Sequence, residues 1–378
     1  MKLFLILVLI LFSSHGFSQE ESDVDQIALA SILVKDGNYS RAERVLKKIS
    51  SEDSRKALKE SLWGMVELHK KNYKDSILRF NKSIELGIKS KEVYIYLSEA
   101  YLQIKDINKA SASLEKVDKG SKEKLPYHLL KSEIYWQKNE KVLAWKILNQ
   151  ALKKKLSKNV IYKKKFKYFM KEKLYFSAYE LAFEFFKNKG LWSDVLAMAS
   201  QLRVNKQYEQ SLKILQALSF VEPRNENIAL EMTQNYLALG DNFSGALILE
   251  EAARVNNDLA FEASELLRQE GKSYRSKYLN FQTLDPKKRL KQKLSLYIED
   301  DDYHSLKLMI PELKEHHLLE DEELRYAVAY SLFRTGDFKK SEEYLKLIAR
   351  DDLFEKSLKL RDEISKCKIE KWACRETI

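Results

Sequence analysis

The chain has little proline and glycine: four Pro and ten Gly in 378 residues. Because sheets need many tight turns, which these residues favour, their scarcity argues against a β-rich fold. It suits nearly continuous helix joined by short turns. Apolar runs are also short after the first dozen residues. None of them reaches the roughly 20 residues that a membrane-spanning helix needs, so the sequence predicts no integral span in the mature chain.

Cysteine is scarce as well, and the only two, Cys367 and Cys374, stand close to the end of the sequence. On one continuous helix this seven-residue spacing separates the Cα atoms by about 10.5 Å, beyond the roughly 7 Å limit for a disulfide. A Cys367–Cys374 bridge is the favoured interpretation, and it requires the helix expected to end near Lys366 to break between Ile369 and Trp372. Two free thiols on a frayed tail are the alternative.

Motifs that mark catalytic sites are missing. There is no HExxH, no Gly-rich phosphate loop and no GxSxG around any serine. The neighbouring His316 and His317 would point about 100° apart on a helix, whereas metal ligands sharing a helix face are three or four residues apart. Carboxylate clusters fall in charged turns without an apolar pocket to shift a pKa. The sequence thus predicts no catalytic residue, no metal ligand and no cofactor.

The N-terminal segment has the pattern of a secretory signal peptide. Lys2 precedes an unbroken apolar run over residues 3–12, and the small residues Gly16 and Ser18 precede a cut before Gln19. A membrane anchor is the alternative, but ten apolar residues are too few to span a bilayer. We therefore expect an exported protein, with the periplasm as the favoured compartment and secretion as the alternative.

Small residues recur every 34 positions, the period of helical-hairpin repeats. The first column is Ala42, Ser76, Ala110, Ala144 and Ala178. The second, twelve residues earlier, is small at four of its five positions, Ala30, Gly64, Ser98 and Ser132, with Phe166 as the exception. Two helices approach closely only where side chains are small, so the columns predict the crossing point within each hairpin. A large apolar group can close the turn three residues before the first column, where the chain has Tyr39, Tyr73, Ile107, Lys141 and Tyr175, with Lys141 as the exception.

This layout resembles the tetratricopeptide repeat (TPR) family, and residues 93–117 form the clearest unit. Tyr208 and Ser211 take the same two roles in a later unit, and Gly-Asp turns typical of the family stand at 240–241 and 336–337. Two units between these Gly-Asp turns, around residues 274 and 303, keep the periodic apolar residues but are expected to lack the small residues. The resemblance implies an all-α, right-handed TPR superhelix, an α-solenoid of about nine to ten helical hairpins.

The resemblance also gives a division of the chain. The expected segments are a signal peptide (1–18), a short linker (19–23), a TPR array (24–255), degenerate TPR-like hairpins (256–321), a TPR-like hairpin (322–350) and a C-terminal capping helix with a Cys-containing tail (351–378).

In TPR folds the first helix of each hairpin, helix A, lines the concave face where partners bind. By this resemblance the candidate partner-binding residues are Lys163, Lys167, Lys171, Glu99, Glu133 and Trp136. The three lysines recur every four residues and should share one stripe of a helix. An acidic peptide segment, or an acidic face of an envelope protein, could dock there with Trp136 as an apolar anchor. Alternatively, the lysines are a solvated face that pairs internally with Glu133 or Glu99.

These observations predict a non-catalytic exported scaffold that mediates protein–protein interactions in the cell envelope. The net charge of +11 and pI near 9.1 leave an anionic envelope polymer or lipid headgroups of a membrane surface as alternative ligands. Export argues against nucleic acid as a partner. A cell-wall-acting enzyme similar to helical-repeat lytic transglycosylases, or its accessory subunit, is a remote alternative, because no separate catalytic domain stands outside the repeats.

Overall fold

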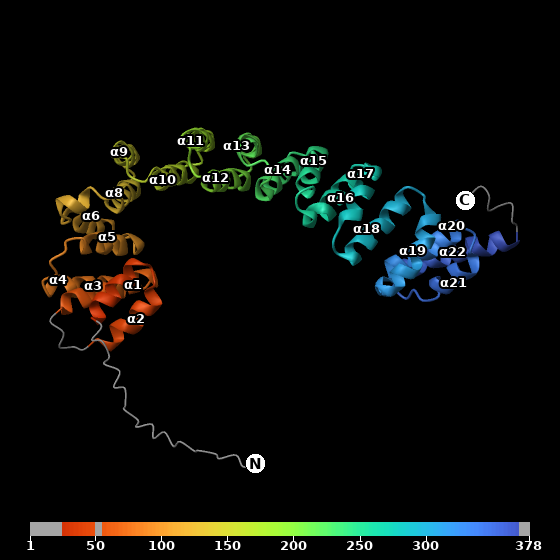
Figure 1. Cartoon of the computed structure of the whole chain (residues 1–378), viewed down its shortest axis with the longest axis horizontal. Helices are drawn as coiled ribbons and strands as arrows, with labels where there is room; N and C mark the ends of the chain where they lie inside the picture. Colours follow the sequence, from red (N-terminus) through yellow and green to blue (C-terminus); the bar gives the residue numbers. More distant parts are fainter. Residues whose placement is uncertain (1–24, 50–54, 370–378) are drawn as a thin grey trace, which may run out of the picture. The chain divides into compact units, whose positions relative to one another are not determined.

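The computed structural model describes residues 25–49 and 55–369 of the chain, and Figure 1 shows their arrangement as helices and connecting turns. Within these ranges there are 22 α-helices, two short 3-10 segments and no strand. The predicted all-α fold is therefore confirmed. The predicted signal peptide (1–18) and linker (19–23) lie outside the described residues, as does Cys374.

Twenty of the helices form ten successive hairpins, in agreement with the predicted nine to ten. The A helices are α1 (Gln26–Lys35), α3 (Lys56–His69), α5 (Val93–Gln103), α8 (Leu125–Gln137), α10 (Lys158–Lys171), α12 (Trp192–Val204), α14 (Glu226–Ala238), α16 (Ala260–Gln269), α18 (Pro286–Glu299) and α20 (Glu322–Arg334). The B helices are α2 (Tyr39–Lys48), α4 (Tyr73–Glu85), α6 (Ile107–Glu115), α9 (Lys141–Lys153), α11 (Tyr175–Lys187), α13 (Tyr208–Val221), α15 (Asn242–Ala253), α17 (Ser273–Gln282), α19 (Tyr303–Glu315) and α21 (Phe338–Leu345).

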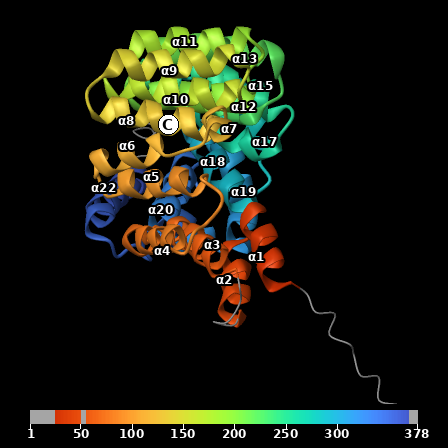
Figure 2. The same ribbon diagram turned by 90° about the vertical axis from the view of Figure 1, so that its left-hand side faces the viewer.

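The chain divides into two compact units, the first ending at Lys165 and the second beginning at Phe166, within α10. In the N-terminal unit α3 contacts α1 and α5, and α5 contacts α8, so the A helices form a continuous layer (Figures 1 and 2). In the C-terminal unit α12 contacts α14, and α18 contacts both α16 and α20. Stacking of this kind joins the apolar faces of neighbouring hairpins into one core.

Four shorter or terminal elements complete the described chain. They are α7 (Lys119–Lys122), η1 (Asn257–Leu259), η2 (Leu318–Glu320) and α22 (Asp351–Ile369). Helix α22 packs on α20 and α21 and buries Leu353, Leu360 and Ile364, as expected of a capping helix. It continues past the expected end near Lys366 and also buries Cys367. The disulfide between Cys367 and Cys374 stays a prediction.

The two columns of small residues meet inside the hairpins, as predicted. Ala30 and Ala42, one from each column, are both fully buried. Ser76 Oγ donates a hydrogen bond of 2.8 Å to the Gly64 carbonyl, and Ser98 Oγ donates one of the same length to the Ala110 carbonyl. The donor can stand in either column, but the partner is always twelve residues away.

The same contact recurs in the C-terminal unit. Hydroxyl groups bind main-chain carbonyls twelve residues away in the pairs Ser211–Ala199, Thr233–Gly245 and Ser341–Ala329, at 2.8, 3.2 and 2.7 Å. In each case a small side chain lets the helices come close enough for a side chain on one to reach the backbone of the other. The polar hydroxyl is buried without leaving a hydrogen-bonding group unsatisfied.

All ten hairpin turns use one backbone geometry. The residue two positions before each B helix has a positive φ, between 56° and 80°. The amides of this residue and the next one bind carbonyls near the end of helix A; the Lys71 amide binds the Leu68 carbonyl and the Asn72 amide binds the Glu67 carbonyl. This is the Schellman motif, which satisfies carbonyls at a helix end. Only four of the ten turn residues are glycine, namely Gly37, Gly240, Gly271 and Gly336.

The expectation that both units around residues 274 and 303 lack the small pair is wrong for the first. Ser264 and Ser276 lie at the crossing of α16 and α17, and each hydroxyl donates to the other residue's carbonyl at 2.8 Å. The prediction placed the turn one residue late, at Tyr274, because an aromatic usually occupies that place. In the next hairpin the equivalent positions are the large residues Leu294 and Leu306, as expected.

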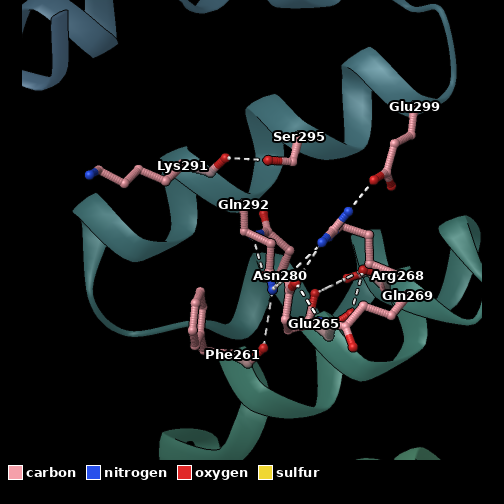
Figure 3. Close-up of polar contacts among 11 residues, drawn as sticks. Phe261, Glu265, Arg268, Gln269, Asn280, Lys291, Gln292, Ser295 and Glu299 are labelled. Atoms are coloured by element: carbon pink, nitrogen blue, oxygen red, sulfur yellow. Dashed lines mark hydrogen bonds and ion pairs between the residues drawn. The ribbon is translucent and has the colours of Figure 1, made fainter. Parts of the chain in front are cut away.

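A buried polar network joins α16, α17 and α18, where the repeat pattern is weakest (Figure 3). The Gln292 side-chain amide donates to Glu265 at 3.1 Å and to the Phe261 carbonyl at 3.2 Å, and its oxygen accepts from Asn280 at 3.0 Å. Arg268 holds Glu265 from the other side at 2.6 Å. The hydrogen bond from Arg268 is the main reason that the pKa of Glu265 falls to about 2, with Gln292 adding to it.

Candidate functional site

The three lysines of the predicted binding stripe are exposed on α10. Lys163, Lys167 and Lys171 are all exposed, whereas Tyr162 and Phe166 are buried. Their spacing places the lysines one turn apart along the helix. The stripe is therefore accessible to a partner, and its role in binding stays a prediction.

The acidic residue expected beside this stripe already has a cation. Glu133 on α8 forms an ion pair with Lys164 and accepts a hydrogen bond of 3.3 Å from Gln137. Internal pairing of Glu133 therefore exists, and Lys164 of α10 takes part in it. Trp136 is half-buried, with Lys141 Nζ 5.7 Å from its ring centre. A partner that used Glu133 would have to displace Lys164 first.

Lys165, on the same helix, is buried against α9. Its ammonium lies 4.5 Å from the centre of the Trp145 ring and donates a hydrogen bond of 2.9 Å to Asn149. A buried lysine needs such partners, since an ammonium without them is costly to remove from water. This residue holds the helices together and is not available for binding.

Glu99 lies in a different setting, at a pocket of about 710 Å³ lined by α1, α3 and α5 and by the starts of α2 and α4. Neither Glu133 nor Trp136 lines it. Burial of the half-exposed Glu99 carboxyl raises its pKa above the usual range. The structure therefore places the two predicted acidic residues in different surroundings, one paired and one desolvated.

Several residues of this pocket, which we call the Glu99 pocket, were missed in the sequence. Tyr96 stands one turn before Glu99 on α5, and Met65 and His69 come from α3. The His69 ring stacks on Tyr39 with the ring centres 4.0 Å apart and the planes 17° apart. The aromatic column at the hairpin turns is the signal that could have located it, since Tyr39 belongs to that column.

The C-terminal unit has a larger open pocket, of about 1000 Å³, beside the α13–α14 turn. Several of its polar side chains already have partners within the protein. Asn256 donates to Glu226 at 2.5 Å, Arg254 pairs with Glu251 at 3.0 Å, and the Asn225 side chain caps α14. These contacts stabilise the joint between two hairpins, so this pocket is the weaker candidate for a ligand.

Helix α17 carries a stripe of exposed aromatic side chains. Tyr274, Tyr278 and Phe281 are 88%, 63% and 82% exposed. Their spacing of four and three residues puts them on one face of the helix. Grouped exposed aromatics of this kind mark surfaces that contact other molecules, because large rings are normally buried.

Two further features concern the described residues only. Residues 25–49 and 55–369 contain no cluster of three or more His, Cys, Asp and Glu side chains placed to hold a metal ion. His317, considered as a metal ligand in the sequence, is exposed in the turn after α19 with a φ of 56°. None of the helices in these ranges is both long and apolar enough to cross a membrane.

No protein-family model matches the chain, and no curated protein is similar to it in sequence. Among solved structures, the human IFIT1 dimer with PPP-AAAA is 13% identical, with 88% of this chain and 82% of that chain covered at a TM-score of 0.33. The APC/C hetero-tetramer Cut9–Hcn1 is 11% identical (85% and 73% covered, TM-score 0.28). YrrB, described as a TPR protein with an unusual peptide-binding site, is 14% identical (65% and 94% covered, TM-score 0.25).

These superpositions are loose, so the assignment rests on the chain's own geometry. Ten hairpins, a 34-residue period in the first five and helix crossings between residues twelve apart are the properties of one repeat architecture. By these properties the chain is an α-solenoid of the tetratricopeptide-repeat type.

Proposed function

We propose that this chain is a non-catalytic, exported scaffold that assembles or tethers proteins of the cell envelope. The observation that carries the proposal is the Glu99 pocket, a ready-made concavity on the A-helix layer that holds a carboxylate with no ion-pair partner among the described residues. The exposed lysines of α10 and the aromatic stripe of α17 add surfaces of different chemistry. Extended binding surfaces of this kind are what solenoids supply.

A photo-crosslinking amino acid at Lys167, introduced in cells, tests the scaffold. The matched control is Gln150, which is exposed on the B helix α9. We expect one defined protein to be captured from position 167 and not from position 150. Capture of the same set of proteins from both positions, or of none from either, would contradict a specific partner surface on the A helices.

Binding to an anionic envelope polymer or to lipid headgroups is the second candidate function, favoured by the three exposed lysines of α10. Charge reversal of Lys163, Lys167 and Lys171 to glutamate separates the two. Diffuse electrostatic binding to vesicles with anionic headgroups should be lost in this variant and in high salt. A defined protein partner that still binds the variant with unchanged affinity would remove the stripe from the binding surface.

Export is part of the proposal and is supported by the pattern of residues 1–18, which lie outside the described structure. Cleavage by a signal peptidase would leave Gln19 as the first residue. N-terminal sequencing of the protein isolated from the cell envelope would test this. A mature chain that starts at Met1 would contradict it.

A further inference from the structure

The Glu99 pocket contains a predicted acidic binding residue that has no ion-pair partner among the described residues. Two other glutamates on A helices have cationic partners: the buried Glu60 pairs with Arg79 and Lys82 at 2.8 and 2.7 Å, and the half-buried Glu231 pairs with Arg203 at 2.7 Å. Among the described residues, none donates a hydrogen bond to Glu99 or forms an ion pair with it.

Burial is accordingly the only cause that raises the pKa of Glu99, and no neighbouring cation lowers it. A desolvated carboxylate without a partner costs free energy in the folded protein. A ligand cation that reached it would recover the attraction that water no longer supplies. The charge of the pocket therefore favours a cationic occupant.

The walls of the pocket suit a cation that is carried on an apolar stem. Leu62 and Met65 of α3 supply apolar surface, and Tyr96 supplies an aromatic ring one turn from Glu99. Aromatic faces attract cations within about 6 Å, and they attract a planar guanidinium more often than an ammonium. A volume of about 710 Å³ exceeds the space that one side chain fills, so part of the main chain of an extended segment fits as well.

The other charged groups at the pocket lie at its edges. Lys35 ends α1 and Lys71 lies in the turn before α4, and both are exposed. His69 is occupied by its stacking on Tyr39. None of the three pairs with Glu99 among the described contacts. The lysines face solvent, where their repulsion of an incoming cation is weakened by screening.

We propose that the Glu99 pocket binds an arginine side chain from an extended segment of a partner protein. Arginine fits better than lysine because its planar fork can bind a carboxylate through two hydrogen bonds and stack on a ring at the same time. This inference rests on the proposed scaffold function and names the chemistry of the partner segment. The proposal gives Glu99 a role in binding that is separate from the role of the α10 lysines.

The test uses the full chain with its methionine methyl groups labelled with carbon-13, so that NMR reads six methyl signals. Met65 lines the pocket, and Met232 in the C-terminal unit is the internal control. The probe is the capped tripeptide acetyl-Gly-Arg-Gly-amide. The comparison peptides carry lysine, or citrulline, which has the shape of arginine without its charge.

We expect the Met65 signal to shift on addition of the arginine peptide while the Met232 signal stays in place. The Glu99→Gln variant should weaken this binding about tenfold or more, because the hydrogen bonds would no longer join two charged groups. Glu85→Gln, which alters an exposed glutamate of α4 outside the pocket, should leave the binding unchanged. Unchanged Met232 and other methyl signals would show that both variants are folded.

Equal binding of the arginine peptide by wild type and Glu99→Gln, equal binding of the citrulline or lysine peptide, or no shift of Met65 at all would overturn the proposal. These results are separable from a failure of the scaffold function. Capture of a defined protein from position 167, with no binding of the arginine peptide, would leave the scaffold in place and remove the arginine pocket.

Discussion

Substitution of Gly64 by alanine tests the helix crossing that defines the repeat. Gly64 lies in α3, where α4 approaches most closely. A Cβ added there would lie 2.5 Å from Cε1 and 2.6 Å from Cδ1 of the Phe80 ring. Carbon atoms in contact are normally about 3.5–4.0 Å apart, so the ring would have to move by about 1 Å.

The Phe80 ring has little room for such a movement. It is fully buried with Val93 and Leu97, and it stacks on Tyr96 at 6.2 Å between ring centres. Overpacking of this kind costs about 1–3 kcal/mol, while replacing a glycine within a helix by alanine gains about 1 kcal/mol. The difference between these two terms is about 0–2 kcal/mol. Because the buried Phe80 ring has little room to move, we expect Gly64→Ala to lower the free energy of unfolding by an amount near the upper end, about 1–2 kcal/mol.

Gly245 in α15 gives a matched control with the opposite expected sign. A Cβ at this position meets its nearest atoms at 3.4 Å or more, an ordinary contact distance. Gly245→Ala should therefore keep only the gain in helix propensity, up to about 1 kcal/mol. Urea unfolding followed by circular dichroism, with hydrogen exchange to locate the change in α3 and α4, measures both variants. Gly64→Ala as stable as the wild type, or both variants shifted the same way, would refute the packing argument.

Three further predictions concern single residues. Lys206 has a φ of 62° in the turn before α13, a backbone conformation that strains any residue except glycine. Lys206→Gly should therefore raise the free energy of unfolding by about 0.5–1 kcal/mol and raise the Tm. A lower Tm would contradict this. The pKa of Glu265 is lowered from 4.5 to about 2, chiefly by the hydrogen bond from Arg268. The ionised Glu265 therefore stabilises the folded protein by an amount on the order of 2–3 kcal/mol above pH 4.5, and this contribution is lost as the pH falls toward 2. Unfolding curves of Glu265→Gln should lack this part of the acid dependence, and an unchanged profile would count against the network. For Glu99 the sign is reversed, because its pKa is raised in the folded protein: the free energy of unfolding falls as the pH rises from the usual glutamate range through the raised pKa. Glu99→Gln should therefore have a higher Tm than the wild type at neutral pH. A lower Tm in thermal scans would contradict the desolvation of Glu99.

The period of the small residues predicted the fold because it reflects a direct geometric need. Ala42 and Ala110 stand where two helices touch, and only small side chains fit there, so the requirement is visible residue by residue. The pair Ser264 and Ser276 was missed because the turn was expected at Tyr274, one residue after its true place, so the positions of the small residues were shifted by one as well.

The candidate site could be predicted only in part. Its exposed lysines follow from helical spacing, which the sequence contains. The pairing of Glu133 with Lys164 and the isolation of Glu99 do not, because they depend on which side chain of the next helix reaches a given carboxylate. Lys163 and Lys164 are adjacent in sequence, and only the rotation of α10 decides which of them meets α8.

The hydroxyl-to-carbonyl contacts at the helix crossings have a consequence for divergence between repeat proteins. The acceptor is a main-chain atom, so the residue that provides it can be alanine, glycine or serine, as at Ala110, Gly64 and Ser276. A hairpin that uses this contact has to keep only one small residue and one hydroxyl, and the two can exchange places between the helices. The crossing of Ala30 with Ala42 does without a hydroxyl. Most other positions can then mutate. Sequence similarity between related repeat proteins can be lost while the spacing of the hairpins is kept.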